Sequence, residues 1–176
     1  MLDTRTDIRE GSASTRQAAA RGPRQNSLAG LLAVEDILLD CDATAREGLF
    51  ERIATALGVR HGLRPTQIVA GLDDRESLGS TALGQGVAIP HARLSGLTRV
   101  IAAFVRLRAA IPFDAPDGKP VSSLLVLLVP EGATDAHLEL LAQAASLFCD
   151  PAFRDRLGRC SAAPEILAAL TGARPS

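Results

Sequence analysis

A run of apolar residues, LLVLLV at positions 124–129, constrains the fold of this chain more than any other feature of its sequence. A strand with one face in water alternates apolar and polar residues, whereas a continuously apolar strand is typical of a sheet covered on both faces. Helices must therefore lie on each side of the sheet that contains this strand. The run is also far too short for a membrane-spanning helix.

Helical and strand patterns alternate around this run. The spacing of Leu49, Ile53 and Leu57 predicts an amphipathic helix over 44–57 that Gly58 ends. Pro65 at a first helical position predicts the start of a second helix. A loop is predicted for the small residues at 79–86, strands at 87–90, 100–107 and 124–129, and further helices at 134–148, 151–157 and 163–170. The alternation predicts an α/β sandwich with a mixed sheet.

Composition places these elements in one domain. The chain has 176 residues, of which 47% are hydrophobic, enough for one core plus a tail. Residues 1–27 contain few apolar side chains, so we expect a disordered tail there and a domain over 28–176. The net charge of −1 leaves no basic excess for gripping nucleic acid, and no basic amphipathic segment suggests a membrane surface.

The cysteines and the N-terminus indicate where the protein works. Cys41, Cys149 and Cys160 are widely spaced and form no C-x-x-C pair, so neither a zinc site nor a redox pair is indicated. An odd number of cysteines favours a reducing compartment. The polar N-terminus lacks the apolar region of a secretory signal. We therefore expect a cytoplasmic protein without membrane insertion.

The histidines differ in their surroundings. His61 lies beside Gly62 between two predicted helices, and we interpret it as an exposed loop residue. His91 follows a proline at the end of the short strand 87–90, beside a glycine-rich segment whose small residues allow close approach by another molecule. His137 lies in the first turn of the helix 134–148, where unpaired N–H groups suit an anion, although a surface or capping role fits it equally well.

An arginine and two hydroxyl residues lie near His91 in the sequence. Arg75, just before the small-residue loop, has the planar charged group suited to phosphate, but a salt bridge to a neighbouring acid is the simpler interpretation. Ser80 and Thr81 could also bind a phosphoryl group. From the residues alone, this set could equally be accidental.

Several ordered motifs resemble one family. GSTALGQGVAIPHARL at 79–94, preceded by Arg75-Glu76, resembles the active-site signature of enzyme IIA domains of the fructose/mannitol/nitrogen class of the bacterial phosphotransferase system. IPFDAPDGKPVSSLLVLLVPE resembles that family's core-strand motif, and DAHLELL resembles its second-histidine helix. The resemblance covers about residues 28–170.

The resemblance implies a mixed, mostly parallel sheet flanked by helices on both faces, and a phosphoryl group carried on His91. The donor would be an HPr-like phosphocarrier protein, and no metal or nucleotide cofactor would be needed. Arg75 and His137 match motif positions that contact the phosphoryl group. Ser80, Thr81 and Gly86 would bind phosphate. Ala92 and Arg93 depart from the Gly and Lys frequent after the family's histidine, which bears on partner choice.

Three functions remain open from the sequence. A chain with this loop and no room for a IIB or transporter domain resembles the nitrogen-type branch, whose phosphorylation state changes which regulatory targets it binds. The alternative is a separate IIA subunit of a fructose- or mannitol-type uptake system. A third possibility is a binding module that is no longer phosphorylated. The sequence does not show which ring nitrogen of His91 reacts.

Overall fold

The computed structural model describes residues 28–132 and 135–172, apart from the side chains of residues 29 and 135–137. The tail predicted at 1–27 lies outside this part. The helices are α1 (Leu28–Leu31), the short 3-10 helix η1 (Val34–Asp36), α2 (Arg46–His61), α3 (Pro65–Ser77), α4 (Asp135–Cys149), α5 (Pro151–Arg159) and α6 (Ala163–Thr171). The strands are β1 (Ile37–Cys41), β2 (Ala82–Gly84), β3 (Val87–Ala88), β4 (His91–Leu94), β5 (Ile101–Ile111) and β6 (Val121–Pro130).

The apolar strand β6 is the centre of the sheet, and its residues 124–128 are fully buried. It pairs antiparallel with β5 on one side and parallel with both β3 and β4 on the other. The described strands form one six-stranded sheet in the order β1-β5-β6-β3-β2, with β4 beside β6. β1 runs parallel to β5, so the sheet is mixed and parallel pairs predominate.

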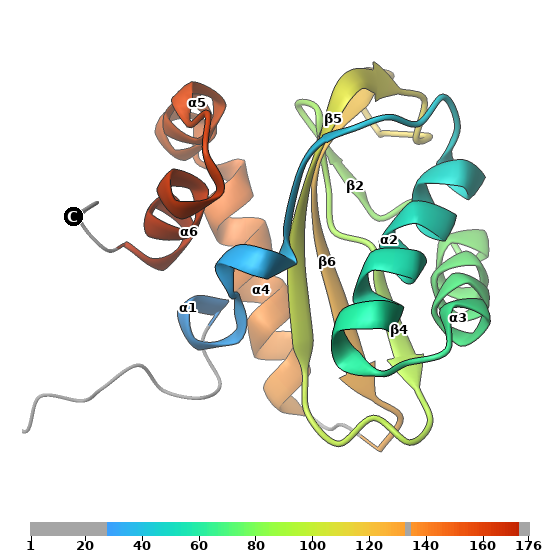
Figure 1. The fold of residues 1–176 in the computed structure, drawn as a ribbon. Coiled ribbons are helices and arrows are strands. Elements are labelled where there is room, and N and C mark those ends of the chain that lie inside the picture. The colour runs from blue at the N-terminus through green and yellow to red at the C-terminus, as the bar shows by residue number, and fades with distance from the viewer. Residues whose placement is uncertain (1–27, 133–134, 173–176) are drawn as a thin grey trace, which may run out of the picture.

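Helices cover both faces of this sheet (Figure 1). α2 and α3 pack on one face, where Leu49, Phe50 and Ile68 are completely buried. α4, α5 and α6 pack on the other face, together with the short α1. The prediction of a sheet between two helical layers is confirmed. None of the helices in the described residues is long and apolar enough to cross a membrane.

The predicted helix end at Gly58 is wrong. α2 continues to His61, and Gly62, in the left-handed conformation with φ of 69°, ends it. Gly58 has a packing role instead. A Cβ atom there would lie 2.9 Å from both the Leu63 carbonyl oxygen and Pro65 Cγ, so only glycine lets the start of α3 come this close.

The predicted loop at 79–86 contains a strand. Ala82–Gly84 forms β2, which pairs antiparallel with β3 around a turn in which Gly84, Gln85 and Gly86 all have positive φ. Small residues and glycines are typical of loops, so the local pattern conceals a strand that tertiary pairing stabilises. β1 (Ile37–Cys41) also lies outside the strands predicted from the sequence.

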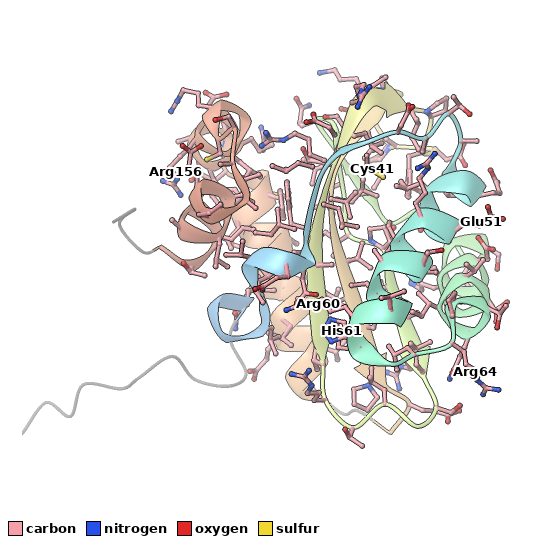
Figure 2. The ribbon with its side chains drawn as sticks, viewed as in Figure 1. Cys41, Glu51, Arg60, His61, Arg64 and Arg156 are labelled. Atoms are coloured by element: carbon pink, nitrogen blue, oxygen red, sulfur yellow. The ribbon has the colours of Figure 1, made fainter. Side chains whose placement is uncertain are left out.

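His61 is not an exposed loop residue. It lies in the last turn of α2, its side chain is 9% exposed, and its Nε2 lies 2.8 Å from Oδ1 of the buried Asp36. Arg60 Nε lies 2.7 Å from the same oxygen. Figure 2 shows Arg60 and His61 side by side at this end of α2. The cluster joins α2 to η1, a contact between residues distant in sequence that local pattern does not reveal.

Candidate functional site

His91 is the first residue of a further strand, β4, whereas the sequence predicted only that it follows the short strand 87–90. β3 ends at Ala88, and β4 begins after Pro90, which has no N–H to donate. Both short strands pair in parallel with β6, with Ala88 opposite Leu124 and His91 opposite Leu127. His91 is therefore held at the sheet by β6 while its side chain stays half-buried.

The two ring nitrogens of His91 have different partners. Nδ1 lies 3.0 Å from the carbonyl oxygen of Ile89, which can only accept a hydrogen bond. Nε2 lies 2.9 Å from Nε of Arg75, which can only donate one. From these partners we assign the neutral tautomer in which Nδ1 carries the hydrogen and Nε2 carries the lone pair. The lone pair of the neutral ring thus lies on Nε2, the nitrogen that faces Arg75.

Arg75 reaches His91 because α3 packs tightly on β4. Gly71 lies one helical turn before Arg75, and a Cβ atom on it would come within 3.0 Å of the Ala92 and Leu94 side chains. The close approach brings the last turn of α3 over the start of β4. Arg75 Nη1 also donates to the carbonyl oxygen of Gly79 at 2.9 Å, which holds the guanidinium in place. Arg75 forms no ion pair with any of the described side chains, so the structure does not contain the salt bridge to a neighbouring acid.

Ser80 and Thr81 use their hydroxyl groups within the protein. Ser80 Oγ donates to the carbonyl oxygen of Phe113 at 2.6 Å, and Thr81 Oγ1 donates to the buried Glu76 carboxylate at 2.6 Å. The carbonyl oxygen of Gly86 accepts hydrogen bonds from the start of β6. The structure therefore brings Arg75 to His91 and gives these other groups structural contacts, so their phosphate-binding role stays a prediction.

His137 lies in the first turn of α4, and its side chain is outside the described part of the structure. The helix nevertheless belongs to the face of the sheet toward which His91 projects. Leu127, the strand partner of His91, packs in the same apolar cluster as Leu140, one turn after His137. Registered neighbours in a sheet project to the same face, so the start of α4 and the ring of His91 share one side of the sheet.

Asp117 stabilises the turn between β2 and β3 by hydrogen bonding. Its carboxylate accepts from the backbone N–H of Gln85 at 2.7 Å and from the backbone N–H of Lys119 at 3.2 Å. The hydrogen bond from Gln85 lowers the pKa of the Asp117 carboxyl, and the Lys119 N–H and ammonium add to this effect. A Cβ on Gly84 would meet this carboxylate at 3.1 Å, so glycine lets the turn sit against it.

We expect Asp117→Asn to lower the melting temperature by a few degrees at neutral pH, because an amide accepts these hydrogen bonds more weakly. A carboxyl whose pKa is lowered in the folded state stabilises the fold above its unfolded-state pKa, and this contribution is lost as pH falls through the lowered value. Melting curves of both proteins from neutral pH to about pH 3 should therefore converge at the acidic end. A gap that stays constant over this range would contradict the linkage.

Comparison with known proteins decides the family. A sequence model described as "Phosphoenolpyruvate-dependent sugar phosphotransferase system, EIIA 2" matches residues 30–172. The chain belongs to this EIIA 2 family. The resemblance of the motifs around Arg75 and His91 to enzyme IIA domains is thus confirmed at the level of the whole domain.

Similar EIIA 2 proteins carry the name nitrogen regulatory protein. One from Pseudomonas aeruginosa is 54% identical over 90 residues, which are 51% of this chain and only 58% of that protein. One from Bradyrhizobium diazoefficiens is 38% identical over 120 residues, or 68% of this chain and 78% of that protein. The crystal structure of nitrogen regulatory protein IIA-Ntr from Neisseria meningitidis matches with a TM-score of 0.78 and 43% identity, covering 81% of this chain and 98% of that one. This EIIA 2 chain is thus similar to the nitrogen-regulatory type.

Proposed function

We propose that this EIIA 2 protein is a phosphohistidine carrier that accepts a phosphoryl group on Nε2 of His91 from an HPr-like carrier protein. The observation that carries the proposal is the pair of hydrogen bonds on the ring: Nδ1 to the Ile89 carbonyl, and Nε2 to Arg75. This arrangement offers a lone pair at Nε2 beside a fixed positive charge. A phosphoryl acceptor needs both features.

The reaction exchanges one P–N bond for another. The lone pair of His91 Nε2 attacks the phosphorus of a phosphohistidine on the donor, a bond forms between Nε2 and phosphorus, and the donor nitrogen leaves with the pair of its broken bond. Nδ1–H stays hydrogen-bonded to the Ile89 carbonyl, which stabilises the positive charge that the ring acquires. Because both nucleophiles are imidazoles, the free-energy change is small and the transfer reverses readily.

Arg75 stabilises the phosphoryl oxygens during this transfer. Its guanidinium is held at Nε2 before the reaction, so it exchanges that hydrogen bond for the incoming oxygens without a large movement. The protein contributes positioning and charge, as in phosphoryl transfer generally. His137 adds a ring donor from the first turn of α4, where the helix N-terminus itself attracts an anion.

We further propose a cytoplasmic regulatory role of the nitrogen type, in which phosphorylation of His91 changes the binding of target proteins. Its support is the likeness to nitrogen regulatory proteins. A phosphoryl group adds negative charge and strong acceptor oxygens at a half-buried site beside Arg75. Such a change alters which surfaces can dock over the site.

The test is transfer from purified donors. We expect the full chain to take an acid-labile, alkali-stable label from a phosphorylated nitrogen-type carrier, and to take it at least about tenfold more slowly from a sugar-type carrier at equal concentration. Preferential labelling by the sugar-type carrier would support a sugar-uptake subunit instead. No label from either donor would overturn the carrier proposal and leave a binding module.

A further inference from the structure

Glu76 is a buried carboxylate to which the transfer chemistry assigns no role. It is 4% exposed and lies next to Arg75 in the last turn of α3. Its two oxygens accept hydrogen bonds from a single residue: the backbone N–H of Thr81 at 2.9 Å and the Thr81 hydroxyl at 2.6 Å. Burying a carboxylate is costly unless hydrogen bonds compensate, so this contact fixes Thr81 strongly.

Thr81 is in turn bonded to the residue that orients His91. Its carbonyl oxygen accepts from the backbone N–H of Ile89 at 3.0 Å, which extends the pairing of β2 and β3 by one residue. The carbonyl oxygen of Ile89 is the partner of His91 Nδ1. Ile89 is also restricted because it precedes Pro90, which confines its backbone to extended conformations. The hydrogen bond to Thr81 on one side and Pro90 on the other therefore fix the direction of the Ile89 carbonyl.

These contacts form a closed ring of interactions. One path runs from Glu76 through Thr81 and Ile89 to Nδ1 of His91. The other runs from Arg75 to Nε2. Both paths start at consecutive residues of α3, so the helix holds the two sides of one imidazole.

We infer that Glu76 is a positioning residue: by fixing the backbone at Thr81, its carboxylate holds His91 in the tautomer and orientation that present Nε2. The link is geometric rather than electronic, because the N–H and the C=O of one residue belong to different peptide groups. A weaker anchor at Thr81 lets the Ile89 carbonyl turn away, so that only the Arg75 contact at Nε2 still selects the Nδ1–H form. Whenever that contact opens, the proton can then move to Nε2 and remove the nucleophile. The role rests on the proposed phosphoryl transfer.

Two kinds of variant test this role. Glu76→Ala removes both acceptors, whereas Thr81→Val removes only the hydroxyl donor and keeps the shape of the side chain. Thr81→Ser retains the hydroxyl and serves as the conservative control. Asp74→Asn removes an exposed carboxylate from the same helix. Asp36→Asn changes a buried carboxylate, 3% exposed, next to β1 at the opposite edge of the sheet, and so controls for loss of stability alone.

The first measurement uses the unphosphorylated protein. The ¹⁵N chemical shifts of the His91 ring report which nitrogen carries the hydrogen. We expect the Nδ1–H form in the wild type, Thr81→Ser, Asp74→Asn and Asp36→Asn, and a mixture of tautomers in Glu76→Ala and Thr81→Val. Asp36→Asn should melt at a lower temperature with an unchanged ring. If Glu76→Ala does not fold, the ring tautomer of Thr81→Val alone tests the positioning role.

The second measurement is the rate of labelling from a phosphorylated carrier. Glu76→Ala should be slower than the wild type by about tenfold to a hundredfold, because misplacing a reacting group by a fraction of an ångström to an ångström costs that much. Folded variants with the wild-type tautomer and rate would overturn the positioning role. A wild type that takes no label would overturn the proposed function instead, while the ring shifts would still decide whether Glu76 positions His91.

Discussion

Replacing His91 by alanine is expected to abolish labelling from a phosphorylated carrier, a loss of at least about 10³-fold, while the protein still folds. The side chain supplies the atom that forms the new bond, so no neighbouring group compensates for it. The fold survives because His91 is half-buried at the start of an edge strand whose neighbours Ala92 and Leu94 supply the packing. The change removes the hydrogen bonds of the ring with Arg75 and with the Ile89 carbonyl, and each contributes only modestly to stability.

His61→Ala is the matched control. The side chain of this histidine is 9% exposed and bonded to the buried Asp36, so its loss should lower the melting temperature more than the loss of His91. Labelling should continue at the wild-type rate, because β1 and η1 lie at the other edge of the sheet from β4. Acid-labile label retained on His91→Ala would show that the acceptor is another residue.

The parts of the fold that follow from burial were predictable from the sequence. A continuously apolar run over 124–129 is too short to span a membrane and is typical of a strand covered on both faces, and β6 is buried on both faces as expected. Pro65 marks the first turn of α3 for a local reason, since a proline lacks only a donor that a first turn does not use. Burial and local backbone chemistry act through the residue itself, so they leave a pattern in the sequence.

Features that depend on distant partners were not predictable in this way. β2 consists of Ala82, Leu83 and Gly84, which have little strand preference of their own, and its turn is held by Asp117 from another loop. The contact of His61 with Asp36 joins residues 25 positions apart. Each of these features depends on a tertiary contact, and a single sequence carries no mark of such a contact.

The candidate site shows the same division. Its residue types were predictable, because Arg75 and His91 stand in motifs that resemble those of a known family. The assignment of Nε2 as the nucleophile required the positions of the Ile89 carbonyl and the Arg75 guanidinium. The role we infer for Glu76 depends on its buried contact with Thr81, since in the sequence it reads as an acid beside an arginine.

Arg75→Ala is expected to slow phosphoryl transfer by about 10³-fold with little loss of stability. Removing one preorganised donor from a developing anion costs on the order of 10²- to 10³-fold, and Arg75 supplies a full charge as well. The structural loss is smaller. Arg75 bonds to the Gly79 carbonyl at the end of α3, and a helix C-terminus that loses one such contact can bond to water. The labelling rate and the melting temperature of Arg75→Ala and the wild type are both measured.

Arg75→Lys separates charge from geometry. A lysine ammonium keeps the charge but lacks the planar fork that reaches both His91 and the Gly79 carbonyl. We therefore expect this variant to transfer faster than Arg75→Ala and more slowly than the wild type. If Arg75 were instead a structural salt-bridge residue, Arg75→Ala would melt at a clearly lower temperature and keep its rate. That result would mean that Arg75 does not stabilise the phosphoryl oxygens, and that the first turn of α4 supplies this stabilisation instead.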